Sequence, residues 1–211
     1  MSSEPPRPGP PPASTPPLRF PSSLSPFDVP ARDYLTRCDA RWDGLSVGAL
    51  IFSHLGPTDR VLLIQRDKSD SLPEKWEIPS GVVSNNPEKD AAVLQAVVRE
   101  LWEETGLLAS ELKRVINAPG EEGFVFSNST KTKVFCRYVF EVGAAEDESG
   151  GMKIRLNPVE HQDFVWATEE EVRERIVERA DGGKQKIDLT SDNLWSLIRE
   201  AFRLRREEKE D

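Results

Sequence analysis

The sequence predicts an α/β fold in which helices pack on both sides of a β-sheet, an α/β/α sandwich. Runs rich in β-branched and aromatic residues, which are typical of strands, alternate along the chain with segments whose apolar residues recur at helical spacing. A glutamate-rich helix that ends at Gly106 lies near the middle of the chain, with strand-like runs on both sides of it. These two observations together favour helices packed against a sheet.

The 211 residues are expected to form one globular domain with a short segment at each end. Residues 1–30 are dominated by Pro and Ser and are expected to be disordered or locally polyproline II. The folded domain is expected over residues 34–205, and the charged residues 206–211 are expected to fray. A passive tail is the simpler interpretation of residues 1–30, and a Pro-rich ligand for a partner protein is the alternative.

The charge and cysteine content exclude several classes of function. A net charge of −9 argues against a general nucleic-acid or anionic-membrane surface, because such surfaces need clustered Lys and Arg. No apolar run is long enough to span a membrane, and residues 1–30 lack the apolar core of a secretory signal. Cys38 and Cys136 have no CxxC or His-spaced partner and are interpreted as free thiols. We therefore expect an intracellular, cytoplasmic protein without a membrane partner.

Two apolar runs, residues 45–52 and 61–66, predict neighbouring buried strands joined by a turn over residues 56–59. Arg66 ends the second strand, where it could either reach a substrate phosphate or pair with an acid. A polar loop follows, and residues 76–82 predict a short strand and a turn that contains Gly81.

The central helix is predicted to begin with Asn86 as its N-cap and Pro87 as its first residue. It is predicted to end at Gly106, which can adopt the left-handed conformation that closes the last turn. Glu100, Glu103 and Glu104 follow the spacing i, i+3, i+4 and share one face. Spacing alone leaves two interpretations open, a solvated acidic face and a binding site for hard cations.

The order of residues from Arg99 to Leu107, Arg-Glu-Leu-x-Glu-Glu-x-Gly-Leu, resembles the signature of the Nudix hydrolases, which cut a diphosphate linked to another group. All seven specified positions of this half match. The resemblance implies a sandwich around a mixed sheet and a Mg²⁺ ion, with Mn²⁺ as a possible substitute. It also implies that Glu100, Glu103 and Glu104 bind the metal and that Arg99 orients these glutamates. Gly81 and Arg66 are the residues expected beside the metal and the diphosphate.

The first half of the signature departs from the family pattern. Ala91 occupies the position where the family has a glutamate, and Asp90 is the nearest acid. Gly81 lies four residues further from Arg99 than the pattern expects, which indicates an insertion around residues 84–86. The departures motivate a second hypothesis, a Nudix-fold binding module with little or no catalysis. A third hypothesis, a structural role through the Pro-rich segment, rests on composition alone.

The second half of the chain predicts further strands at residues 112–116, 123–126 and 132–142, then a solvated loop at residues 144–152. In Nudix enzymes an acid just before a Trp-bearing strand often reaches the metal site, and Glu160 fits that placement. Glu146 and Glu148 are its rivals. His161 is more often simple polar surface than a site residue. Either Glu104 or Glu160 would act as the general base.

Two helices are predicted to close the chain. Thr168 caps the first, with Glu171 completing a capping box, and this helix is predicted to end at residues 182–183. The last helix begins near Ser191 and carries apolar residues at helical spacing. Nothing in the sequence selects one substrate among nucleoside triphosphates, dinucleoside polyphosphates, nucleotide sugars and coenzyme diphosphates. The expected partner is therefore a small molecule of the nucleotide-diphosphate type.

Overall fold

The structure, a computed structural model, describes residues 17–39, 41–53, 56–147, 150–179 and 181–210. The helices are the 3-10 helix η1 (Ser22–Phe27), α1 (Ala31–Arg37), α2 (Val93–Thr105), α3 (Glu169–Glu174) and α4 (Asp192–Glu210). The strands are β1 (Gly44–Ser53), β2 (Arg60–Arg66), β3 (Trp76–Glu77), β4 (Ser80–Val82), β5 (Ala109–Ile116), β6 (Phe124–Ser127), β7 (Val134–Ala144), β8 (His161–Ala167), β9 (Ile176–Glu178) and β10 (Lys184–Lys186).

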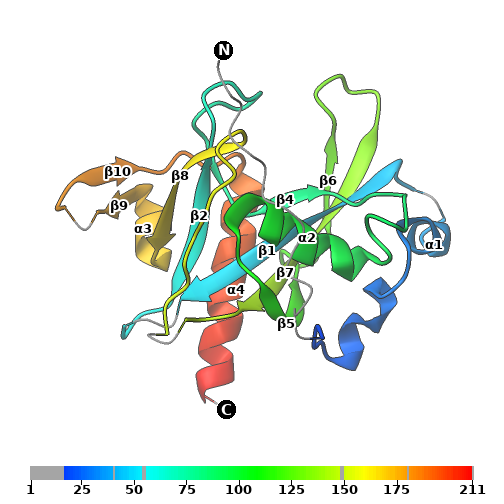
Figure 1. Ribbon diagram of the computed structural model, residues 1–211, viewed down its shortest axis with the longest axis horizontal. Coiled ribbons are helices and arrows are strands. Elements are labelled where there is room, and N and C mark those ends of the chain that lie inside the picture. Colours follow the sequence, from blue (N-terminus) through cyan, green and yellow to red (C-terminus); the bar gives the residue numbers. More distant parts are fainter. Residues whose placement is uncertain (1–16, 40, 54–55, 148–149, 180, 211) are drawn as a thin grey trace.

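Eight strands form a mixed sheet with β1 at its centre. β1 and β7 run parallel, whereas the other pairs in this sheet are antiparallel. β1 pairs with β2 only through Phe52 with Val61 and Ser53 with Arg60, so the two strands diverge beyond this point. The sheet therefore opens into two lobes, β2 with β3 and β8 on one side and β4, β5, β6 and β7 on the other (Figure 1).

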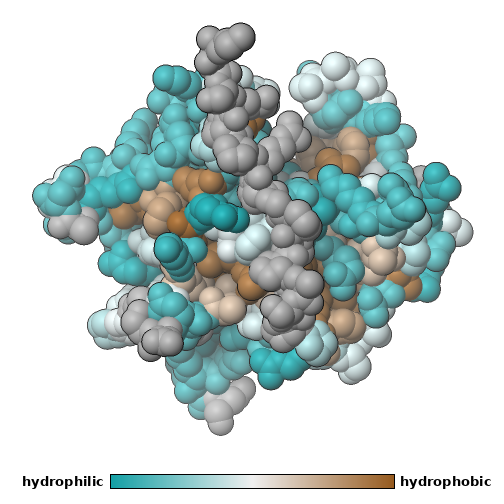
Figure 2. Space-filling view, viewed as in Figure 1, coloured by the Kyte–Doolittle hydropathy of each residue, from teal (hydrophilic) through white to brown (hydrophobic). Residues whose placement is uncertain are grey.

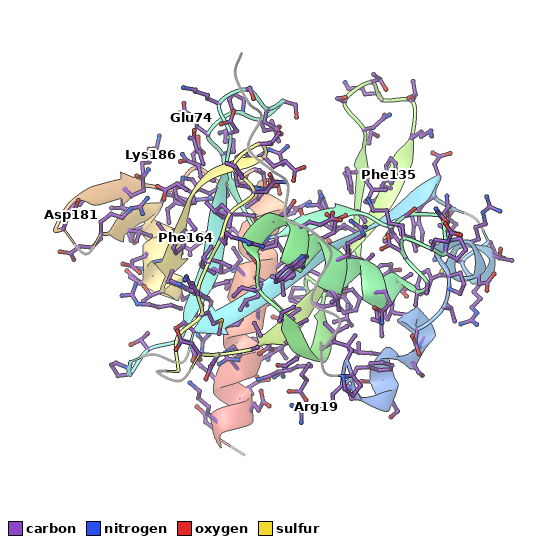
Figure 3. All side chains as sticks on the ribbon, in the orientation of Figure 1. Arg19, Glu74, Phe135, Phe164, Asp181 and Lys186 are labelled. Carbon is purple, nitrogen blue, oxygen red and sulfur yellow. The ribbon has the colours of Figure 1, made fainter. Side chains whose placement is uncertain are left out.

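Helices cover both faces of this sheet, which confirms the predicted α/β/α sandwich around a mixed sheet. One core packs α2 and α1 against β1 and β7, and the other packs α4 and α3 against the opposite face. Hydrophilic residues cover most of the face seen in Figure 2, with hydrophobic patches beside β2 and β8 and at the foot of the β6–β7 hairpin. Phe135 on β7 and Phe164 on β8, both labelled in Figure 3, lie on the two separate lobes.

The packed part of the chain begins earlier than the predicted boundary at residue 34. Leu24 and Phe27 of η1 are buried, and the Phe27 ring stacks on Tyr34 with centroids 5.0 Å apart. The Phe27 ring also makes edge-to-face contacts with Tyr138 and Phe140 on β7. The prediction of disorder is therefore wrong for residues 17–30, because a few well-placed apolar side chains complete the core under α2. The predicted disorder of residues 1–16 lies outside the described residues.

We expect Leu24→Ala to lower the free energy of unfolding by about 2 to 5 kcal/mol, since Leu24 is 1% exposed and its removal leaves a cavity in the core. Urea or guanidinium denaturation measures the change. Leu72→Ala is the matched control, because Leu72 is 44% exposed and should contribute little. Equal stabilities of the two variants would contradict the docking of η1 on the domain.

The N-terminus of α2 differs from its prediction. Asn86 caps a tight turn instead of the helix, since its Oδ1 accepts a hydrogen bond from the Glu88 N–H at 3.0 Å. Ala92 then takes an extended conformation, with φ −146° and ψ 162°, and the helix begins at Val93. Its predicted end is confirmed, because Gly106 adopts the left-handed conformation with φ 68°.

For the C-terminal helices, the predicted capping box is confirmed, and the predicted ends of both helices differ from the structure. The capping box of α3 is present, with Thr168 Oγ1 accepting from the Glu171 N–H at 3.2 Å. α3 nevertheless ends at Glu174, because Arg175 is left-handed, and residues 182–183 turn the β9–β10 hairpin. α4 continues to Glu210, into the segment expected to fray. Within the described residues, no helix is both long and apolar enough to cross a membrane.

Candidate active site on the glutamate-rich helix

The C-terminal half of α2 presents its acids to β4. The Ser80 N–H donates to Glu104 Oε2 at 2.9 Å, and Glu104 is 6% exposed. Gly81 lies against Glu100, because a Cβ at this position would come within 2.1 Å of the Glu100 carboxyl carbon. Only a glycine allows the strand to approach the helix this closely. The structure therefore brings Gly81, Glu100 and Glu104 together, as the sequence predicts.

Arg99 holds the segment between β4 and α2 in place. Its Nε and Nη2 donate to the two oxygens of Asp90 at 2.7 and 2.8 Å, and Asp90 also accepts from the Ser84 N–H. Its Nη1 donates to Glu100 at 2.6 Å and Glu103 at 3.0 Å. Asp90, one residue before Ala91, is 1% exposed. Its contact with Arg99 places a carboxylate close to the position where Ala91 has none. A fork-shaped guanidinium pairs with a carboxylate in this bidentate way with high geometric specificity.

The loop that carries Glu160 is hydrogen-bonded to the end of the same helix. The last carbonyls of a helix have no partner within it. Here the Thr105 carbonyl accepts from the Arg155 N–H at 2.8 Å, and the Glu104 carbonyl accepts from the Asn157 N–H at 3.1 Å. The Asn157 carbonyl then accepts from the N–H groups of Glu160 and His161. Buried Asn157 therefore fixes a tight turn that places Glu160 beside the helix.

Glu104, Glu160 and His161 form a group whose possible ligand atoms all lie within 4.8 Å of one another. His161 is 3% exposed, and its Nε2 lies 3.3 Å from Glu77 Oε1. An ionised carboxylate can only accept, so a hydrogen bond across this contact requires Nε2 to be the donor. Nδ1 is buried and has no hydrogen-bond partner among the described residues. His161 therefore belongs to the site, although the sequence favours polar surface for it.

A cavity of about 330 Å³ opens between these groups. It is lined by Arg66, Asp70, Glu77, Ser80, Gly81, Val82, Glu100, Glu104, Glu160 and His161. Arg66 is held by carboxylates on both sides, with its Nε donating to Asp70 at 3.0 Å and its Nη1 donating to Glu77. Pairing with acids is thus the arrangement that the structure shows for Arg66. Glu77 was missed by the sequence reasoning, although an acid inside the otherwise apolar run 76–79 was a usable signal.

Negative charge is concentrated in this cavity. Burial raises the pKa of the Glu104 carboxyl well above its usual value, and the carboxylates of Glu77 and Glu100 raise it further. Burial also raises the pKa of Glu100, against the opposing charge of Arg99. A bound cation would favour the ionised form of both groups.

The other predicted acids lie elsewhere. Glu103 is not part of the cavity lining, and its half-exposed carboxylate accepts from Arg99. Glu146 lines a separate cavity with Glu141 and Arg205. Glu148 lies outside the described residues. Of the three rivals, Glu160 is the one that the structure places beside Glu104.

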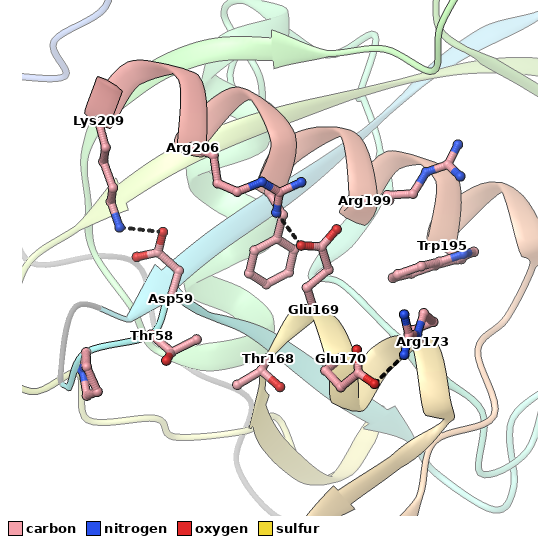
Figure 4. A pocket seen from close by; sticks show the side chains of 12 residues that line it. Thr58, Asp59, Thr168, Glu169, Glu170, Arg173, Trp195, Arg199, Arg206 and Lys209 are labelled. Atoms are coloured by element: carbon pink, nitrogen blue, oxygen red, sulfur yellow. Dashed lines mark hydrogen bonds and ion pairs between the residues drawn. The ribbon is translucent and has the colours of Figure 1, made fainter. Parts of the chain in front are cut away.

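A larger cavity, about 680 Å³, lies between α3, α4 and the β1–β2 connection, far from these acids in the fold (Figure 4). Most of its charged residues form ion pairs with one another, and Arg199 is outside these pairs. Lys209 contacts Asp59 at 2.9 Å, and Arg206 and Arg173 pair with Glu169 and Glu170. Ion pairs at an exposed surface are weak and common. The smaller, acid-lined cavity is therefore the candidate active site.

Comparison with known protein families identifies the family of this chain. The model of the NUDIX domain family matches residues 44–187, and the chain belongs to this family. No curated protein matches the chain. The matched range contains β4, the glutamate-rich helix and the loop that carries Glu160.

Solved structures share the fold at low sequence identity. A MutT protein from Methanosarcina mazei is 24% identical, with a TM-score of 0.50 over 80% of this chain and 96% of its own. The NUDIX domain of NrtR from Shewanella oneidensis, solved with ADP ribose, is 18% identical, with a TM-score of 0.52 over 80% of this chain and 97% of its own. An Ap4A hydrolase from C. elegans is 20% identical, with a TM-score of 0.50 over 78% of this chain and 98% of its own. These likenesses concern the fold.

Proposed function

We propose that this chain is a divalent-cation-dependent hydrolase that cleaves the diphosphate bridge of a nucleoside diphosphate linked to another group. The observation that carries the proposal is the meeting of Glu104, Glu160 and His161 at the cavity shared by α2 and β4. Membership of the Nudix family supports the same chemistry. One of the similar structures is named an Ap4A hydrolase and another is solved with ADP ribose, and both of these compounds contain phosphoanhydride bridges.

The residues present fit a divalent cation. Among the described residues, Glu104 is buried without an ion pair and the buried Nδ1 of His161 has no hydrogen-bond partner. Both features are costly unless a cation satisfies them. Glu104, Glu160 and His161 would hold the ion, with Glu100 beside them. The carboxylates suit Mg²⁺ and Mn²⁺, whereas an imidazole ligand is more typical of Fe, Ni, Cu and Zn. The bound ion would neutralise the diphosphate and lower the pKa of the attacking water.

A carboxylate of the cavity would accept the proton of the attacking water. Glu104 and Glu160 are the candidates. The Ser80 N–H fixes Oε2 of Glu104, and Oε1 has no hydrogen-bond partner among the described residues. The water oxygen bonds to one phosphorus, the bridging P–O bond breaks, and the products are a phosphate monoester and its phosphorylated partner. Arg99 would keep Glu100 oriented throughout and would not contact the reacting atoms.

Two sequence observations, Ala91 and the insertion around residues 84–86, led to the hypothesis of a binding module without catalysis, and the first of them carries less weight in the structure. Ala91 suggested a weakened loop, yet Asp90 makes the bidentate contact with Arg99 that such a loop needs. The insertion remains, and it forms the turn around Asn86 on the surface. We therefore favour catalysis over binding alone.

Hydrolysis is expected to require added Mg²⁺ or Mn²⁺, because the acids that motivate the proposal are metal ligands and not a nucleophile with its base. Chromatographic detection of the phosphate monoesters released from nucleoside triphosphates, dinucleoside polyphosphates, nucleotide sugars and coenzyme diphosphates measures this. Excess chelator should abolish the release, and added metal should restore it. Full turnover in excess chelator, or no release from any substrate of the panel, would contradict the proposal.

A further inference from the structure

The cations near the candidate active site differ in their availability to a substrate. Arg66 is held by Asp70 and Glu77, and Arg99 is held by three carboxylates. A phosphate group would have to displace these acids before either arginine could bind it. Both arginines therefore support the site and offer little charge to an incoming anion.

Arg137 on β7 is the exception. Its Nε donates to Ser46 Oγ at 3.0 Å, and the Ser46 hydroxyl donates to the Gly81 carbonyl at 2.8 Å. Among the described residues, the contacts of the Arg137 guanidinium are the hydrogen bond from Nε to Ser46 and the Phe126 ring, and no carboxylate pairs with it. Burial lowers the pKa of Arg137, and the carboxylates of Glu77 and Glu104 oppose this effect. The guanidinium is thus uncompensated and lies within electrostatic reach of the cavity.

The sheet register connects Arg137 with the cavity. Val82 of β4 pairs with Ser46 of β1, Ser46 pairs with Arg137 of β7, and Arg137 pairs with Phe124 of β6. Residues directly opposite one another on neighbouring strands point to the same face. Val82 lines the cavity and is 52% exposed, so this row begins at the active site. With strands about 4.8 Å apart, Arg137 lies about 10 Å from Val82 along the row.

Aromatic rings surround the far end of this row. The Phe126 ring stacks beside Phe124 with centroids 5.8 Å apart and beside Phe135 with centroids 5.7 Å apart. The guanidinium carbon of Arg137 lies 5.0 Å from the Phe126 centroid. Phe135 lies over Gly44, where a Cβ would come within 2.7 Å of its ring, so a side chain there would displace it. All three rings remain partly exposed at the foot of the β6–β7 hairpin.

We propose that Arg137 and the three stacked rings of Phe124, Phe126 and Phe135 form the nucleoside-binding surface of the enzyme. Arg137 binds a phosphate oxygen through its Nη groups, and the rings receive the base by stacking. This inference rests on the proposed function, because it takes the diphosphate to lie at the acid-lined cavity. It assigns these residues of β6 and β7 to the nucleoside part of the substrate that the proposed function names.

The geometry and the chemistry support this assignment together. A guanidinium forms fork-shaped contacts with phosphate, and a base of any kind can stack on aromatic rings or on an arginine plane. The distance from the cavity to the rings, two to three strand spacings, is comparable to the length of a nucleoside diphosphate. A sequence-tolerant stacking surface also fits an enzyme whose sequence carries no base-specific motif.

Calorimetric titration with two non-hydrolysable probes tests the proposal. Both α,β-methylene-ADP and methylenediphosphonate carry a bridged diphosphonate, and only the first carries a nucleoside. In the presence of Mg²⁺ the unmodified protein should bind the nucleoside probe about 5- to 100-fold more tightly, as expected for a stacked base. Phe126→Leu should remove most of this preference. Arg137→Gln should weaken both probes about 10-fold or more.

Matched controls are available on the same chain. Phe20→Leu changes a partly exposed phenylalanine outside the active site, and Arg203→Gln removes one positive charge from the surface of α4. Neither should alter binding of the two probes. Circular dichroism and melting temperatures show that each variant is folded.

The outcome separates this inference from the proposed function. The inference is overturned if the unmodified protein binds the two probes equally. It is also overturned if Phe126→Leu keeps the full preference for the nucleoside probe. Metal-dependent hydrolysis could still be observed in either case. Conversely, a preference that depends on Phe126 without hydrolysis of any panel substrate would support the nucleoside surface and refute catalysis. If Arg137→Gln binds both probes as tightly as the unmodified protein, the proposed contact between Arg137 and phosphate is refuted.

Discussion

Glu104→Gln is expected to lower turnover by a factor of about 10² or more while the protein stays folded. The substitution is nearly isosteric and keeps an acceptor for the Ser80 N–H, which donates to Glu104 at 2.9 Å. It removes the buried negative charge that would hold the cation or accept the proton of water. Steady-state kinetics with the best substrate of the panel measures the loss.

Stability should respond differently from activity in this variant. A buried carboxylate without a cation is unfavourable, so the metal-free Glu104→Gln protein should be at least as stable as the unmodified protein. Glu88→Gln is the control, since Glu88 lies on the exposed turn before α2 and should retain full activity. A folded Glu104→Gln protein with near-normal turnover would refute the catalytic interpretation of the glutamate-rich helix.

Arg205→Ala is expected to lower the free energy of unfolding by about 3 to 5 kcal/mol without touching the active site. Arg205 on α4 is 5% exposed, and its Nη1 donates to Glu141 Oε1 at 2.5 Å. Its Nε and Nη2 donate to the two oxygens of Asp59 at 3.1 Å each. The guanidinium also lies over the Phe52 ring, 4.4 Å from its centroid. The variant leaves Glu141, which is 1% exposed, without its closest cation and with Arg114 Nε, 2.8 Å away, as the remaining one.

Denaturation in urea measures this change, with Arg203→Ala as the control. Arg203 on the same helix pairs with Glu200 and Glu207 at the surface, where such pairs contribute about 0 to 1 kcal/mol. A double variant, Arg205→Met with Glu141→Leu, should recover much of the loss because no buried charge is left uncompensated at residue 141. A loss below about 1 kcal/mol for Arg205→Ala would mean that the network is a surface feature.

Local sequence signals predicted the parts of the site that one element builds alone. Glu100 and Glu104 share a helix face because of the helical period, and Gly106 ends that helix because it has no Cβ. The capping box of Thr168 and Glu171 is likewise a short-range pattern, and it forms as predicted. In each case the residues that decide the geometry lie within a few positions of one another.

Contacts between segments far apart in the sequence could not be predicted from such short-range patterns. Glu77 and His161 are 84 residues apart in sequence, and only the pairing of β2 with β3 and β8 brings them together. Asp90 replaces the missing glutamate because the chain geometry before α2 turns its carboxylate toward Arg99, which spacing does not reveal. The docking of Phe27 similarly depends on Tyr138, a residue of a distant strand.

The parallel pairing of β1 with β7 has a consequence for the order in which the protein can fold. Ser46 and Arg137, which this pairing joins, are separated by 91 residues. Contacts of such large sequence separation close a long loop and form slowly. While the chain is being synthesised, α2 and the strand β1 on which it packs are complete before β7 emerges, so the part of this core that β7 supplies is still missing. A nascent chain that ends before residue 134 therefore lacks β7 entirely, and with it the proposed nucleoside-binding surface.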